Sequence, residues 1–296
     1  MQMRIVLVAA GAATALLAAA CGGAGSPASG AVDVVASTNV YGDIASQIGG
    51  SHVSVTSILS DPNADPHLFE PGTSNGLAVA KARLVVQNGV GYDAFMTKLE
   101  SAAPSSSRTV VTIADVLGVH AADANPHLWY DVPALGRIAG AIGSGLVEAD
   151  PSHAAAYRAG LARFRASLAP LRAEVARIRS RFAGASVAYT EPVPGYLLAA
   201  AGLRNVAPAA FTRAIEDGSD PTPQALAAMN ALIAKHRIRA LLYNSQAVSP
   251  VTRRLRSEAR AAKIAAVPVT ETLPPGQTFQ QWQLAQVRAL ENALAS

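Results

Sequence analysis

Two short stretches of the chain share a pattern of residue types that can hold a metal ion or carry out catalysis. Residues 65–71 read DPHLFEP and residues 125–131 read NPHLWYD, so each stretch places a histidine after a proline and before a leucine and an aromatic residue. Because proline fixes the backbone φ angle, we expect His67 and His127 to be held rigidly. Rigid placement is what a metal ligand or a catalytic group requires.

Two carboxylates are candidates to join these histidines. Glu191 and Glu271 each directly follow a predicted strand in the second half of the chain. In open α/β sheets, ligands bind beyond the carboxyl ends of the strands, and the loops that carry His67 and His127 lie at such ends. If the two halves of the chain face each other, two imidazoles and two carboxylates converge between them. This donor set suits zinc or manganese and is too rich in nitrogen for calcium or magnesium.

Two aspartates near the histidines are candidates for supporting roles. Asp65 and Asp131 either accept hydrogen bonds from the imidazoles and so fix their tautomers, or simply cap a loop and a helix. Three other histidines stand at the ends of predicted elements without any partner motif, and we interpret them as surface residues: His52, His153 and His236.

The elements that must position these groups alternate between strands and helices. Strands are predicted at 32–37, 52–59, 84–87, 110–113, 186–190, 205–208, 240–243 and 264–270, with amphipathic helices between most of them. This alternation predicts an α/β fold with two lobes, each containing a mostly parallel four-stranded sheet flanked by helices. Residues 211–220 are polar and are predicted to form a loop.

One segment interrupts the alternation. Between residues 151 and 182, apolar residues recur every three or four positions with arginines between them, which predicts one long amphipathic helix with a kink at Pro170. We interpret this helix as the link between the lobes. The predicted domains are therefore an N-terminal lobe at 32–150, a linking helix at 151–184 and a C-terminal lobe at 185–296.

The start of the chain has the features of an export signal. Residues 1–20 contain one positive charge, a long apolar run and small residues before Cys21, as in a secretory signal peptide. The run LAAAC resembles a bacterial lipobox, in which the cysteine receives a lipid, and residues 21–31 are predicted to form a flexible tether. We therefore expect a lipid-anchored protein on the outer face of the cytoplasmic membrane. The alternative is an ordinary secreted protein with a stray cysteine in its signal peptide.

Composition excludes several other classes of protein. Half of the 296 residues are hydrophobic and only 15% are charged, which argues against disorder. The formal net charge is only +4, and no basic run is interleaved with aromatic residues, so nucleic acid is not an expected partner. Cys21 is the only cysteine, so no internal disulfide can form.

Taken together, the motifs resemble those of the zinc/manganese solute-binding proteins of bacterial ABC importers, whose two lobes are joined by one long helix. The resemblance rests on the two Pro-His motifs and on Glu191 five residues before Tyr196, and it covers nearly all of the chain after residue 20. It implies that His67, His127 and Glu191 are metal ligands. It also implies that a monomer captures a divalent metal ion and delivers it to a membrane permease. A separate ATPase would supply the energy, because this chain has no Gly-x-x-x-x-Gly-Lys phosphate loop.

The resemblance leaves the fourth ligand and the identity of the metal open. The family usually has an aspartate a few residues after the last strand, where Glu271 is the nearest carboxylate in this chain. Either Glu271 takes that place, or a water completes the site and Glu271 orients another ligand. Glu191 stands where many zinc members have histidine and manganese members have glutamate, whereas the general stability order favours zinc. We expect zinc in the purified protein and leave manganese open as the physiological cargo.

Two alternative functions fit parts of the sequence, and a third is left open by it. A secreted zinc metalloenzyme could also use two histidines and a carboxylate, but the chain has no His-Glu-x-x-His motif, and a fourth carboxylate ligand would close the position that an attacking water needs. A binding protein for an organic solute or a metal chelate should have more aromatic and polar groups around a larger cavity. On a role as a surface adhesin the sequence is silent. No enzyme activity is therefore expected.

Overall fold

The first half of the chain is built on a parallel sheet in the order β2-β1-β3-β4. The structure, a computed structural model, describes residues 30–62 and 69–296. The strands are β1 (Val32–Thr38), β2 (Val53–Leu59), β3 (Leu84–Gln87) and β4 (Thr109–Thr112). Val34, Val35 and Ala36 of the central β1 are each at most 1% exposed. Such a continuous apolar run is typical of a parallel strand that is covered on both faces.

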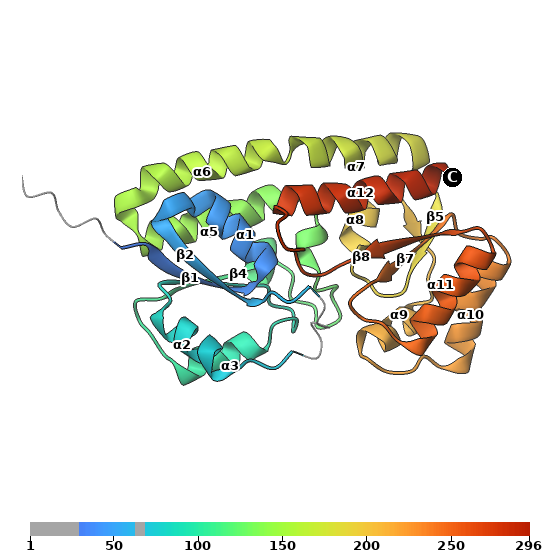
Figure 1. Ribbon diagram of the computed structural model, residues 1–296, viewed down its shortest axis with the longest axis horizontal. Coiled ribbons are helices and arrows are strands. Elements are labelled where there is room, and N and C mark those ends of the chain that lie inside the picture. Colours follow the sequence, from blue (N-terminus) through green and yellow to red (C-terminus); the bar gives the residue numbers. More distant parts are fainter. Residues whose placement is uncertain (1–29, 63–68) are drawn as a thin grey trace, which may run out of the picture. The chain divides into compact units, whose positions relative to one another are not determined.

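Helices cover both faces of this first sheet (Figure 1). They are α1 (Asn39–Gly49), α2 (Thr73–Lys81), α3 (Phe95–Ala102), α4 (Ile113–Leu117) and α5 (Leu135–Ala149), with short 3-10 helices at Gly50–His52 (η1) and Leu128–Tyr130 (η3). Val35 and Val85 pack towards α2 and α3, whereas Val34 and Val86 belong to the core under α1 and α5. The alternation of side chains along each strand therefore divides the core into two layers.

The second half repeats the same plan. Its parallel sheet has the order β6-β5-β7-β8. The strands are β5 (Ser186–Tyr189), β6 (Arg204–Asn205), β7 (Ala240–Asn244) and β8 (Ala265–Val269). The helices are α8 (Gly195–Ala200), α9 (Ala209–Glu216), α10 (Pro223–Ala234), α11 (Pro250–Ala261) and α12 (Phe279–Ala295). The predicted fold of two four-stranded parallel sheets flanked by helices is thus confirmed.

The predicted linking helix consists of two helices. A 3-10 turn at Pro151–His153 (η4) leads into α6 (Ala154–Ser167), and α7 (Ala169–Phe182) follows after an interruption at Leu168. Pro170 lies in the first turn of α7, where its missing N–H costs no hydrogen bond. The interruption therefore falls two residues before the proline at which the kink was predicted.

Close packing fixes the link against both halves. A Cβ on Gly160 of α6 would lie 2.1 Å from the carbonyl oxygen of Ile48, so only glycine permits α6 to approach α1 this closely. On α7, Arg177 and Arg181 donate to the Glu291 carboxylate of α12 at 2.6 and 2.7 Å. Figure 1 accordingly shows α12 alongside α7. Residues 31–296 form one compact unit, and its largest hydrophobic core includes residues of both sheets.

Two local predictions were wrong. Residues 211–220 were predicted to form a loop, but most of α9 lies there, because Phe211 and Ile215 are one helical turn apart and both are buried. The strand predicted at 205–208 is reduced to the two residues of β6. The presence of α9 affects the site, because the last residue of this helix is the acidic Glu216.

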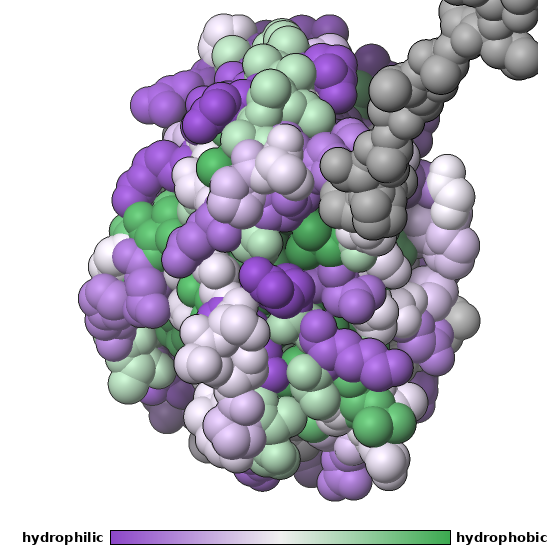
Figure 2. All heavy atoms as spheres, turned by 90° about the vertical axis from the view of Figure 1, so that its left-hand side faces the viewer, coloured by the Kyte–Doolittle hydropathy of each residue, from purple (hydrophilic) through white to green (hydrophobic). Residues whose placement is uncertain are grey.

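The surface gives a separate constraint. Figure 2 shows hydrophilic and hydrophobic residues mixed over the face that it presents. Among the helices within residues 30–62 and 69–296, none is both long enough and apolar enough to cross a membrane.

Candidate metal site

Two of the candidate residues lie just beyond strands, and a third lies in a loop that follows a short helix. His127 stands in the loop between α4 and α5 and is fully buried. Glu191 and Glu271 each lie two residues after a strand, β5 and β8 respectively, and are at most 1% exposed. One imidazole of the first half and two carboxylates of the second half are therefore buried at the predicted ends of the sheets.

The imidazole of His127 directly faces carboxylates of the second half. Its Nε2 atom lies 3.1 Å from Oε2 of Glu271 and 4.0 Å from Oε1 of Glu216, the last residue of α9. Its Nδ1 atom lies 2.8 Å from Oδ1 of Asn125. Because an amide oxygen can only accept, Nδ1 carries a hydrogen, and Nε2 is the ring nitrogen that faces the carboxylates. A cation bound at Nε2 would offset the negative charge of the two carboxylates.

Glu271 is held by several donors. Asn244 Nδ2 donates to Oε1 at 2.6 Å, and the Tyr92 hydroxyl donates to Oε2 at 2.9 Å. The backbone N–H of Glu271 donates to Gln246 Oε1 at 2.6 Å. Burial raises the pKa of Tyr92 well above its ordinary value, and the Glu271 charge raises it further, so this phenol stays protonated and continues to donate. The carboxylate therefore has a fixed orientation towards His127.

Asn125 connects the two halves beside the site. Its Nδ2 donates to the carbonyl oxygen of Pro192 at 2.7 Å, and its own carbonyl oxygen accepts from the Tyr196 hydroxyl at 2.9 Å. Its Oδ1 also accepts from the backbone N–H of His127 at 3.0 Å. One side chain thus orients the imidazole and fastens its loop to the segment that follows Glu191.

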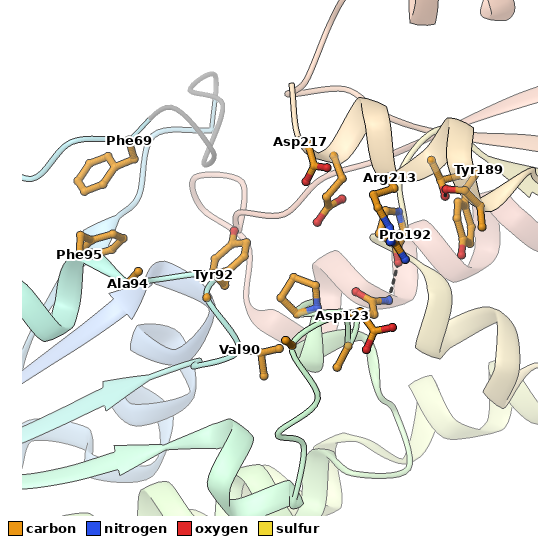
Figure 3. A pocket seen from close by; sticks show the side chains of 18 of the residues that line it. Phe69, Val90, Tyr92, Ala94, Phe95, Asp123, Tyr189, Pro192, Arg213 and Asp217 are labelled. Atoms are coloured by element: carbon orange, nitrogen blue, oxygen red, sulfur yellow. Dashed lines mark hydrogen bonds between the residues drawn. The ribbon is translucent and has the colours of Figure 1, made fainter. Parts of the chain in front are cut away.

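A cavity of about 1190 Å³ adjoins this group of residues. Its lining includes Asn125, Pro126 and Glu216, which are neighbours of His127 in sequence or in space. In Figure 3, Tyr92 lines the cavity from the first half, and Arg213 lines it from α9. The cavity therefore opens beside the loop that carries the buried imidazole.

Three of the predicted residues, His67, Asp65 and Cys21, lie outside the described residues. Within the described ranges, no three histidine, cysteine or acidic side chains form a group that could hold a metal by themselves. The structure brings His127 and Glu271 into contact, and the full predicted set of four ligands stays a prediction.

Asp131 lies in the turn that leads into α5, where its Oδ1 accepts from the backbone N–H of Ala134 at 3.3 Å. Its predicted supporting role at the site stays a prediction. The acceptor on the His127 ring is Asn125, which sequence reasoning missed. An Asn two residues before His127 is a signal that could have found it, because such side chains fold back onto the following backbone.

Sequence reasoning also missed Glu216. The residue was placed in a polar loop, whereas the i and i+4 spacing of Phe211 and Ile215 could have indicated a helix that ends at the cavity. Its side chain is 16% exposed and therefore largely shielded from solvent.

Known proteins resemble this chain in sequence and in fold. The manganese-binding lipoprotein MntA of Halalkalibacterium halodurans is 32% identical over 148 residues, which are 48% of this chain and 49% of that protein. The MntA protein of Bacillus subtilis is 27% identical over 142 residues, 46% of each chain. The matches therefore span about half the length of these curated relatives.

The similarity to solved structures extends over nearly the whole chain. The periplasmic zinc-binding protein TroA of Treponema pallidum has a TM-score of 0.75 at 19% identity, covering 90% of this chain and all of that one. A crystal structure of ZnuA has a TM-score of 0.70 at 22% identity, covering 89% and 98%. At these identities the similarity shows a shared fold. The sequence model of the zinc-uptake complex component A family, described as periplasmic, matches residues 34–293, and the chain therefore belongs to this family.

Proposed function

We propose that this chain is the extracytoplasmic solute-binding protein of an ABC importer and that it captures one divalent transition-metal ion between its two halves. The observation that carries the proposal is the buried His127 imidazole, whose Nε2 atom faces the carboxylates of Glu271 and Glu216. An imidazole nitrogen beside two carboxylates is a donor set for a borderline divalent cation. Membership of the zinc-uptake family and the relatives named as manganese-binding or zinc-binding proteins support the same function.

The proposed ligands come from both halves. His127, Glu191 and Glu271 would bind the metal together with His67, whose motif resembles that of His127. Asn125 would hold the His127 ring in the tautomer that leaves Nε2 able to bind. The cargo would be zinc or manganese. The ion is bound and released without chemical change, so no catalytic residue is assigned.

The proposed partners follow from the role in transport. The protein would deliver the ion to a membrane permease that is driven by a separate ATPase, and it would act as a monomer. We also propose that Cys21 carries a lipid that anchors the protein to the outer face of the cytoplasmic membrane. Residues 32–150 and 185–296 would form the lobes, and residues 151–184 would connect them.

A thermal-shift panel tests metal binding. The purified protein is stripped with a chelator and melted with zinc, manganese, iron(II), calcium or magnesium. A ligand at about a hundred times its dissociation constant stabilises the folded state by roughly 2.7 kcal/mol. A clear rise in Tm with zinc or manganese, and a much smaller one with calcium or magnesium, is the expected result. If none of the ions raises Tm, the protein binds another class of solute.

A further inference from the structure

The outer face of the linking helices carries arginines and no exposed acidic residue. The only acidic residue of α6 and α7 is Glu174, which is buried. Apart from arginines, the exposed residues of these two helices are alanines, serines and Pro170. The one acidic residue of the neighbouring α12 is Glu291, which is also buried. We define the arginine face as the exposed arginines of the three helices: Arg158, Arg163, Arg165, Arg172, Arg177, Arg179, Arg181 and Arg288.

Charge is distributed unevenly along the chain. With eight arginines and two glutamates, α6, α7 and α12 have a formal net charge of +6. Residues 31–150 contain five lysines and arginines against twelve acidic residues, which gives a formal net charge of −7. A negatively charged partner is therefore attracted to the arginine face and repelled by the first half of the chain.

The arginine face and the cavity lie on different sides of the sheets. Phe164 and Ile178 of the linking helices belong to the core that also contains residues of α1, α5 and α12. The helices that line the cavity, α3 and α9, pack through Met96 and Phe211 into separate cores on the other faces of the two sheets. Figure 1 accordingly shows α6 and α7 along the top of the molecule and α3 and α9 below the sheets. A partner on the arginine face would leave the cavity uncovered.

We propose that the arginine face binds the anionic headgroups of a lipid bilayer and so holds the folded body against the membrane with its cavity facing away. Guanidinium groups bind phosphate oxygens in pairs, and each basic group near an anionic lipid surface adds to the attraction. The 28 residues of α6 and α7 span about 42 Å, which matches an extended surface better than a small anion. Because no large apolar side chain is fully exposed on either helix, the contact stays at the level of the headgroups.

The position of the proposed lipid at Cys21 favours a bilayer as the partner. Cys21 precedes Val32 of β1 by eleven residues, which reach at most about 40 Å. The body would therefore stay close to the membrane, where a weak electrostatic contact suffices because the effective concentration of the surface is high. The inference goes beyond metal capture, and its test needs neither the metal nor the lipid on Cys21.

Binding to vesicles tests the proposal on residues 31–296, which form one compact unit and lack Cys21. The protein is sedimented with vesicles of phosphatidylcholine alone and with vesicles that also contain the anionic lipid phosphatidylglycerol. We expect binding to the anionic vesicles and none to the uncharged ones. Binding should also weaken as the salt concentration rises, because salt screens the attraction between exposed charges.

Two double variants locate the contact. Arg163→Gln with Arg172→Gln removes two charges from the arginine face, whereas Arg253→Gln with Arg260→Gln removes two from α11, which packs on the other side of the second sheet. All four side chains are exposed, and no ion pair within the described ranges involves any of them. The first pair should weaken partitioning into anionic vesicles at least about tenfold, and the second less than about threefold. Both variants should keep the melting temperature of the wild type.

Single fluorescent labels show which side faces the bilayer. Cys21 is the only cysteine of the chain, so Ala162→Cys or Thr97→Cys gives residues 31–296 one labelling site. Both positions are exposed, the first on α6 and the second on α3. Lipids with a spin label on the headgroup should quench a fluorophore at position 162 and leave one at position 97 unquenched.

Several results would overturn the proposal. They are equal binding to charged and uncharged vesicles, equal losses in the two double variants, and quenching at position 97 as strong as at position 162. Binding to soluble polyphosphate without binding to anionic vesicles would also overturn it, since the partner would then be a polyanion in solution. None of these results bears on metal capture, which the thermal-shift panel tests separately.

Discussion

Two histidine–carboxylate pairs lie in different regions of the molecule. Both have short nitrogen–oxygen distances, but their side chains differ in how far they are exposed to solvent. His127 Nε2 lies 3.1 Å from Glu271 Oε2, and both side chains are fully buried. His153 Nδ1 lies 2.5 Å from Asp150 Oδ2 where α5 gives way to α6, with side chains 27% and 12% exposed. A short contact between an imidazole and a carboxylate is therefore not enough to identify a binding site.

The difference lies in how the donor atoms are directed. The His153 ring stacks on His52 with centroids 4.0 Å apart and an interplanar angle of 24°, so the nitrogen lone pairs of the two rings lie in nearly parallel planes. Asp150 is the N-cap residue of η4 and accepts from the Tyr157 hydroxyl of α6 at 2.7 Å. Around His127, in contrast, carboxylates from two other elements converge on one nitrogen. Convergence of elements distant in the sequence, together with burial, distinguishes a candidate metal site from a helix cap.

The largest expected effect is that of Glu271→Gln on metal affinity. The substitution removes a charged donor from the site, so zinc and manganese binding should weaken by more than about a hundredfold, beyond the loss typical of supporting residues. The metal-free variant should melt somewhat lower than the wild type, because the new amide NH2 group meets one of the two donors, Asn244 Nδ2 or the Tyr92 hydroxyl, from which the carboxylate accepts. Isothermal titration and metal-free melting measure the two effects. A variant that melts lower but keeps its affinity would make Glu271 a structural residue.

Asn125→Ala should have an intermediate effect on affinity. The substitution removes the acceptor that fixes the His127 tautomer and the donor to Pro192. Loss of such supporting groups typically costs about ten- to a hundredfold in metal affinity. The same titration measures it, with Asp131→Ala as the control, because Asp131 accepts from the backbone N–H of Ala134 in the turn before α5. Equal losses in the two variants would show that Asn125 has no special role.

The smallest expected effect is that of Asp150 on the free energy of unfolding, and it involves no metal. Burial would raise the pKa of the Asp150 carboxyl, but hydrogen bonds from Ser152, Tyr157 and His153 outweigh it and hold this pKa below its ordinary value. Its stabilising contribution is therefore complete above the unfolded-state pKa of about 3.9 and is lost as the pH falls through the folded-state value.

Asp150→Asn should accordingly destabilise the protein at neutral pH, and the difference from the wild type should shrink below about pH 4. Urea unfolding at a series of pH values measures this difference. Metal affinity should be unchanged in the same variant. A difference in unfolding free energy that stays constant down to pH 2 would show that the charge of Asp150 does not stabilise the cap.

Most of the fold could be predicted from the sequence, because the strands are short apolar runs and the segments between them have a clear helical periodicity. β1 and β7, for example, are buried along nearly their whole length, which local hydrophobicity reveals directly. α9 was missed because it is only eight residues long and is held by two buried residues, Phe211 and Ile215. The stacking of His52 on His153 was missed as well, because it depends on the tertiary approach of η1 to α6.

The site was predicted less completely than the fold. The motifs pointed to His127 and Glu271, whose contact joins residues 144 positions apart. Sequence alone could not single out Asn125 and Glu216. Asn125 matters through its contact with Pro192, and Glu216 through its approach to His127, and each of these partners belongs to the opposite half. Asp131 was a candidate for the acceptor role that Asn125 fills, since both flank His127 and sequence alone does not show which one turns back towards the ring.

The most direct test of the metal site is anomalous diffraction from crystals grown with manganese or zinc. The proposal predicts one strong peak about 2.1 Å from Nε2 of His127 and within bonding distance of a Glu271 oxygen. The second histidine pair, His52 and His153, should carry no peak of comparable height. A principal peak at the second pair, or no peak beside His127, would contradict the assignment of the buried site.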